Sequence, residues 1–141
     1  MHAAVIVGRN TSAAVLLVLC VSAVSAQSRP SRWKDIGPTA SGNMVSVDPR
    51  TIKRTGNLVA ATVRVVFATP VQTPRGPWSS SHTTATFDCV KKSLAAKENV
   101  YYGDKGEKKV TERKVNVLPG YGPALGGSLG AVALNYLCAL K

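Results

Sequence analysis

The alternation of apolar and polar side chains predicts long β-strands in the middle of the chain. From residue 58 to 69 every second side chain is apolar, which is the period of a strand with one buried face. Residues 83–90 alternate in the same way and place Ala85, Phe87 and Cys89 on one face. We expect the first strand to lie centrally in an antiparallel sheet, with a long loop over residues 70–81.

Two shorter segments near the start of the chain have the same strand character. Residues 33–37 are expected to form a brief strand in which Trp33 and Ile36 anchor the core. Residues 44–48 follow as a second strand, which ends where the Asp-Pro dipeptide begins a turn.

A hairpin is predicted in the second half of the chain. Residues 91–99 are polar and basic, and a short strand at 100–102 follows them. The turn Gly103-Asp104-Lys105-Gly106 joins it to a strand at 108–118, whose Val115 and Val117 are expected to face inward.

The C-terminal residues 128–141 have the spacing of an amphipathic helix. Ser128 follows a flexible link rich in glycine and proline, and a serine in that position is a typical N-cap. Apolar residues then recur at intervals of three and four and form one stripe: Leu129, Val132, Ala133, Tyr136, Leu137 and Leu140.

The N-terminal segment 1–26 has the parts of a secretory signal peptide. Arg9 supplies the positive region, residues 13–21 the apolar region, and Val24-Ser25-Ala26 the small residues of a cleavage site. The mature chain would begin at Gln27 and form one domain, residues 27–141. The apolar run is shorter than the roughly 20 residues of a membrane-spanning helix, so we expect no transmembrane span. An uncleaved anchor is the alternative.

Cys20 raises a second alternative, the attachment of a lipid. The motif Leu17-Val18-Leu19-Cys20 matches a lipoprotein signal poorly, because Leu19 is large where a small residue is expected. We therefore expect Cys20 to be removed with the leader, and its lipidation stays open.

Cys89 and Cys138 are the two cysteines outside the leader. Export into an oxidising compartment favours a disulfide between them, which would tie the helix to the sheet. Two free buried thiols are the alternative.

The chain is strongly basic, with 18 lysines and arginines against 7 aspartates and glutamates. Such a charge favours anionic partners, although a solvated surface without a dedicated partner explains it equally well. For an exported protein we expect no nucleic-acid partner in vivo.

The candidate ligand-binding residues surround the predicted hairpin, where several cations can reach an anionic polymer without being buried. Tyr101 could add stacking contacts, and Lys141 places an ammonium beside the terminal carboxylate, as in the ligands of lysine-binding kringle modules. The basic residues of this hypothesis are Lys105, Lys108, Lys109, Arg113 and Lys114.

No catalytic, metal or cofactor site is predicted. Ser81, His82 and Asp88 are the residue types of a nucleophilic triad, but no nucleophile-elbow motif accompanies them. The carboxylates are scattered rather than paired, and a single histidine outside the leader leaves zinc without ligands.

The chain resembles the surface-adhesin protein E family of Gram-negative bacteria. The resemblance rests on short motifs in the same order: Trp33-Lys34-Asp35-Ile36-Gly37, Val45-Ser46-Val47-Asp48-Pro49, Ile52, Arg54-Thr55-Gly56-Asn57, Phe87-Asp88-Cys89, Val100-Tyr101-Tyr102 and Tyr136-Leu137-Cys138. It implies an α+β fold, a single antiparallel sheet of about six strands with the C-terminal helix on one face.

The resemblance also implies a function, since the founding member of the family is a lipid-anchored adhesin that captures host matrix and plasma proteins. We expect a non-enzymatic binding protein at the outer-membrane surface that engages host matrix or plasma proteins, or polyanionic glycans. A soluble periplasmic protein with a structural or envelope-maintenance role is the alternative.

Overall fold

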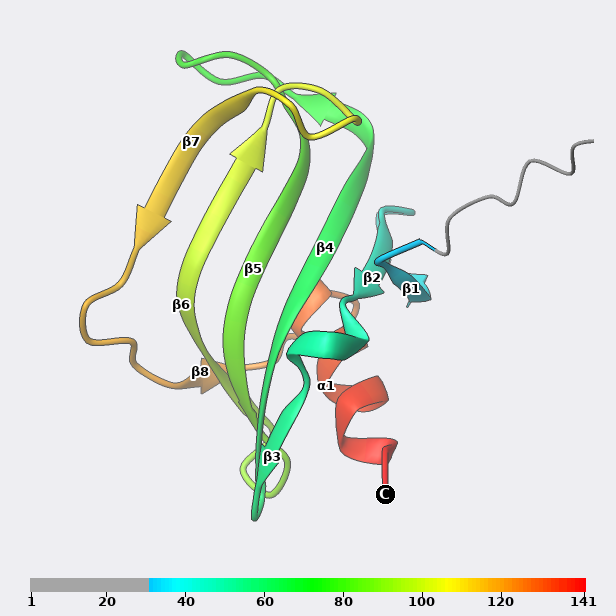
Figure 1. Cartoon of the computed structure of the whole chain (residues 1–141), viewed down its shortest axis with the longest axis vertical. Coiled ribbons are helices and arrows are strands. Elements are labelled where there is room, and N and C mark those ends of the chain that lie inside the picture. The colour runs from blue at the N-terminus through cyan, green and yellow to red at the C-terminus, as the bar shows by residue number, and fades with distance from the viewer. Residues whose placement is uncertain (1–30) are drawn as a thin grey trace, which may run out of the picture.

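The computed structural model describes residues 31–141, so the predicted leader, Cys20 and the cleavage site lie outside the described residues. The described chain forms one antiparallel sheet with a C-terminal helix against one face (Figure 1). Six strands run in the order β1-β2-β4-β5-β6-β7, while β3 pairs with β4 and β8 with β6. The predicted α+β fold is therefore confirmed.

The strands differ greatly in length, and a 3-10 turn, η1, follows β2 at Pro49–Thr51. Their bounds are β1 Lys34–Pro38, β2 Met44–Val47, β3 Lys53–Thr55, β4 Leu58–Val71, β5 Trp78–Asp88, β6 Ser93–Tyr102, β7 Val110–Val115 and β8 Gly122–Pro123; the helix is α1 Leu129–Ala139.

Strand β6 begins well before the predicted short strand. It is paired on both sides, with β5 and with β7. The pairing with β5 extends back to Ser93, and β8 pairs at Ser93 and Leu94, so backbone hydrogen bonds outweigh the polar composition of residues 93–99. The loop between β4 and β5 is correspondingly shorter than predicted, because the two strands pair as far as Val71 and Trp78.

Two side chains of the second hairpin strand do not face inward as predicted. Val115 is 58% exposed, and Val117, beyond the end of β7, is 89% exposed. Strand β7 is the last strand of the ordered sheet, and the helix packs on β1, β2, β4, β5 and β6 instead. An apolar side chain on β7 therefore has no helix to pack against and stays exposed to solvent.

The core lies between α1 and the face of the sheet that it covers, which we call the inner face. Ala133, Leu134 and Leu137 pack on alternate residues of β2, β4 and β5. Val63 and Phe87 are each 1% exposed. The predicted alternation is thus confirmed, and Ser128 caps the helix by accepting a hydrogen bond from the Ala131 amide.

The C-terminal end of α1 is fastened to the sheet at two points. Cys89 and Cys138 form the predicted disulfide, with 5.5 Å between their α-carbons. Arg54 of β3 donates hydrogen bonds to the carbonyl oxygens of Leu137 and Leu140, at 3.0 and 2.9 Å. A guanidinium at this end satisfies carbonyls that have no partner within the helix.

Asp48 organises the start of the chain from a buried position. Its carboxylate, 2% exposed, accepts hydrogen bonds from Arg32 and from Arg50. Burial by itself raises the pKa of this carboxyl, but the hydrogen bonds from the two arginines outweigh it, so the pKa lies below its usual range.

The disulfide predicts a large loss of stability in Cys138→Ser. Because the bridge closes a separation of 49 residues, its removal should cost about 2–5 kcal/mol and lower the melting temperature by on the order of 10 °C or more. Calorimetry of the mature domain measures this shift. The double variant with Cys89→Ser controls for the free thiol, and an unchanged melting curve would contradict a structural role for the bridge.

Asp48 predicts a loss of stability in acid. Since the folded state lowers this pKa, the contribution is present above the unfolded-state pKa of about 3.9 and is lost as the pH falls through the lower folded-state value. Urea unfolding between about pH 5 and pH 2 should therefore show a steeper decline for the wild type than for Asp48→Asn. Asp35→Asn, on the neighbouring strand, is the control. Parallel curves for wild type and Asp48→Asn would show that the interaction is absent.

Candidate functional site

The predicted basic hairpin exists, and its tip, residues 103–109, is an ordered turn. The Asp104 carboxylate accepts hydrogen bonds from the amides of Lys108 and Lys109, at 3.1 and 2.9 Å from Oδ1. These backbone hydrogen bonds lower the pKa of Asp104. The side chains of Lys105, Lys108 and Lys109 are exposed on this turn.

Glu107 fastens the tip to the face of the sheet opposite the helix, which we call the outer face. Its backbone has a φ of 60°, and its carboxylate reaches Arg64 of β4 and His82 of β5. The His82 Nε2 atom lies 2.9 Å from Glu107 Oε2. Neither contact has the geometry of a well-aligned hydrogen bond, and all three side chains are no more than 21% exposed.

Two aromatic rings enclose His82 on the outer face. Its ring centre lies 4.6 Å from that of Trp33 and 4.7 Å from that of Tyr102. Burial raises the pKa of Tyr102, and the charge of Glu107 adds to that effect. Trp33 was predicted to anchor the core, and it joins this outer-face cluster instead.

The residue types of a nucleophilic triad do not come together. Ser81 and His82 are consecutive in β5, so their side chains point to opposite faces of the sheet. Asp88 lies at the far end of the strand, where it accepts hydrogen bonds from the amides of Val90 and Lys91. His82 contacts Glu107 and Tyr102 through its two ring nitrogens instead.

Arg113 and Lys114 do not extend the cationic tip as a single surface, because consecutive residues of β7 face opposite sides. Arg113 donates to Glu98 on the outer face, at 2.7 Å. Lys114 lies on the inner face, 3.6 Å from Glu112. The tip therefore carries three of the five predicted cations.

Tyr101 stacks within the protein. Its ring is 3.9 Å from the Trp78 ring, with 19° between the planes. The ammonium of Lys114 is 5.3 and 5.5 Å from the two ring centres. Because these distances are nearly equal and the rings are so close, the ammonium lies beside the stack, above neither ring.

Lys141 is remote from the hairpin. The C-terminus lies at the end of the sheet near the β3–β4 turn, whereas the β6–β7 connection is at the other end (Figure 1). The terminal lysine therefore cannot join the hairpin cations on one surface.

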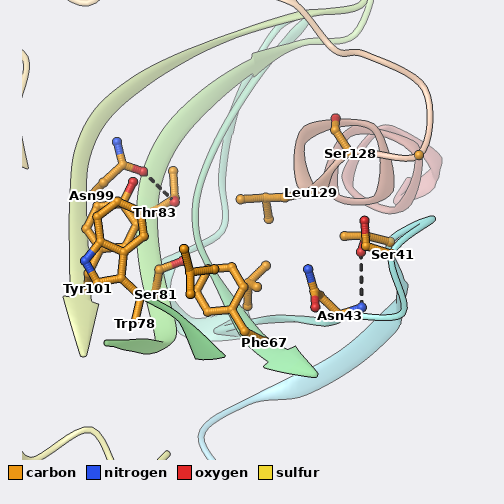
Figure 2. A pocket seen from close by; sticks show the side chains of 14 residues that line it. Ser41, Asn43, Phe67, Trp78, Ser81, Thr83, Asn99, Tyr101, Ser128 and Leu129 are labelled. Carbon is orange, nitrogen blue, oxygen red and sulfur yellow. Dashed lines mark hydrogen bonds between the residues drawn. The ribbon is translucent and has the colours of Figure 1, made fainter. Parts of the chain in front are cut away.

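A pocket of about 350 Å³ opens on the inner face beyond the N-terminus of α1 (Figure 2). The turn at 39–43 closes one side and is held there by the Ala40 amide, which donates to the Gly127 carbonyl. A side chain at Gly127 would meet Ala40, at 2.7 Å between their β-carbons. The lining residues are Thr39, Ser41, Asn43, Val65, Phe67, Val71, Trp78, Ser81, Thr83, Asn99, Tyr101, Gly127, Ser128 and Leu129.

This pocket and the outer-face cluster were both missed from the sequence. Glu107, Arg64 and His82 come from a loop and two strands that only the sheet register brings together. The one available signal for the pocket was the group of serines and threonines at 79–84, interrupted by His82, of which Ser81 and Thr83 line the pocket.

Within residues 31–141, no three potential metal-ligating side chains (His, Cys, Asp or Glu) gather, and no helix has the length and apolarity to cross a membrane.

The fold and its disulfide define a small antiparallel-sheet domain closed by one C-terminal helix. A model of the family described as surface-adhesin protein E matches residues 33–139, and the chain belongs to that family. The resemblance recognised in the sequence motifs is thus confirmed.

Solved structures of Haemophilus influenzae protein E share this fold. Crystal form II is 12% identical with a TM-score of 0.54, and the match covers 79% of this chain and 91% of that chain. The selenomethionine form, also 12% identical, has a TM-score of 0.53, with 81% and 91% covered. No curated protein matches the sequence.

Glu107 predicts a coupling between the hairpin tip and the sheet. In Glu107→Gln the contacts with Arg64 and His82 lose their anionic partner, and we expect faster amide exchange across residues 103–109 and a loss of roughly 1–3 kcal/mol. Hydrogen-exchange mass spectrometry measures the tip directly. The control is Glu98→Gln, which breaks the more exposed ion pair with Arg113. Equal exchange in the two variants would contradict the coupling.

Proposed function

We propose that this chain is an exported, non-enzymatic binding protein of the surface-adhesin type, which uses the hairpin tip to engage anionic groups on host matrix or plasma proteins or on glycans. Membership of the surface-adhesin protein E family supports the class of function. The observation that carries the choice of site is an ordered turn that presents exposed ammonium groups. The proposal requires that the protein is exposed at the cell surface.

The electrostatics of the tip support this choice. Within the described residues, no ion pair engages Lys105, Lys108 or Lys109. The acidic residues of the turn are turned inward, Asp104 toward backbone amides and Glu107 toward the sheet. The tip therefore presents three ammonium groups outward that form no ion pair with another described residue, which favours contact with polyanions.

The rigidity of the tip adds to its suitability. Asp104 and Glu107 hold the turn in one conformation before any partner arrives. A preorganised site loses less conformational entropy on binding than a flexible loop does. The hypothesis for Lys141 as a kringle ligand stays separate, because that residue lies at the other end of the molecule.

Neutralising the tip should weaken binding to heparin, the probe for an anionic glycan. In Lys105→Gln/Lys108→Gln/Lys109→Gln we expect a loss of about tenfold or more at physiological ionic strength and a weaker dependence on salt. Surface plasmon resonance on immobilised heparin measures both quantities, and the same variants can then be tested on matrix proteins.

The matched control carries the same change of charge elsewhere, in Lys91→Gln/Lys92→Gln/Lys97→Gln, three further exposed lysines. If both triple variants lose affinity equally, net charge drives the binding and the tip is not its site.

A further inference from the structure

The inner-face pocket has a chemical character opposite to that of the tip. None of its lining residues is charged, although the chain carries a formal net charge of +11. Aromatic side chains form one wall, and aliphatic side chains together with small hydroxyl and amide groups line the rest (Figure 2). Its volume of about 350 Å³ is at the lower end of the range for small-molecule sites. The pocket therefore suits a single ring or a group of that size.

The polar groups of the pocket are arranged chiefly as hydrogen-bond donors. Asn43 uses its carbonyl oxygen to accept from the Ala68 amide at 2.9 Å, and Asn99 uses its own to accept from Thr83 at 2.7 Å. Each carboxamide is thereby oriented with its NH₂ group free of those bonds. Ser81 is 4% exposed, and its hydroxyl forms no hydrogen bond with another described residue. The two NH₂ groups suit a ligand that offers oxygen acceptors, and the hydroxyls can donate to it as well.

The side chain of Lys114 lies at the edge of this set of donors and carries a positive charge. Asn99 and Lys114 are direct partners across β6 and β7, and both side chains lie on the inner face. The Lys114 ammonium is beside the Trp78–Tyr101 stack that walls the pocket. Its neighbour Glu112 is shared with Arg75, at 3.4 Å, so positive charge is in excess at this rim.

We infer that the pocket binds one carboxylate-bearing sugar residue, of the uronate class, within an anionic glycan. The apolar face of the pyranose ring packs on the aromatic wall. Its ring and hydroxyl oxygens accept from Ser81 and Asn43, and its carboxylate lies between the Asn99 amide and the Lys114 ammonium. A sulfated residue fits less well, because the pocket lining offers no cation to a second anionic group. The inference rests on the proposed function and specifies its ligand.

An unsulfated probe separates the pocket from the tip. A hyaluronan hexasaccharide contains uronate carboxylates but no sulfate, so its binding depends less on the lysines of the tip. Calorimetric titration of the mature domain should show saturable binding. In ¹⁵N-labelled protein, the side-chain NH₂ signals of Asn99 should shift.

Asn99→Asp is the decisive variant. It preserves the oxygen that accepts from Thr83 and replaces the free NH₂ with a negative oxygen, so hyaluronan affinity should fall by about tenfold or more. Asn57→Asp, the same change at the exposed β3–β4 turn, is the control and should alter affinity by less than about twofold. Melting curves of both variants test folding.

The outcomes distinguish the pocket from the tip. Hyaluronan binding that is lost in Asn99→Asp but kept in the tip variant supports the inference, whether or not the tip binds heparin. Equal affinities of Asn99→Asp and Asn57→Asp, or no binding of hyaluronan at millimolar concentration, overturn it. The inference also fails if an uncharged N-acetylglucosamine oligomer binds as tightly as hyaluronan, since the ligand would then be a neutral sugar. It fails likewise if an enzymatically deglycosylated matrix protein binds in an Asn99-dependent way, since the ligand would then be a polypeptide.

Discussion

The short helix on a long sheet is the constraint from which the inner-face pocket follows. With 11 residues, α1 is about 17 Å long, whereas the 14 residues of β4 extend about 46 Å. The disulfide and Arg54 hold the C-terminal end of the helix near the β3–β4 end of the sheet. The inner face beyond the N-terminus of α1 is left uncovered, and there it forms a pocket in place of a core.

The elements with a strong period could be predicted from the sequence, because burial on one face imposes that period. Alternation in β4 and β5, the helical stripe and the Ser128 cap are properties of neighbouring residues. The pairing of Cys89 with Cys138 followed because no other cysteine outside the leader was available. In each case a local pattern or a simple count was sufficient.

The candidate sites were less predictable, since they depend on register and on which strand lies at the edge. Val115 has the side-chain character of a core residue, yet it lies on an edge strand that the helix does not cover. Lysine and arginine at consecutive positions of β7 appear as one cluster in the sequence and lie on opposite faces in the sheet. Glu107, which has a positive φ, meets His82 where the tip turns back over the strands.

In the two proposals, the separation of charge from hydrogen bonding gives the two surfaces different roles in recognition. Exposed lysines attract any polyanion over about a Debye length, roughly 8 Å at physiological ionic strength, and carry little specificity. A set of oriented donors in a pocket acts only at contact. It discriminates between ligands because the wrong ligand leaves its polar groups without hydrogen-bond partners. A charged tip and an uncharged pocket on one sheet therefore suit a protein that first captures an anionic chain and then selects one residue of it.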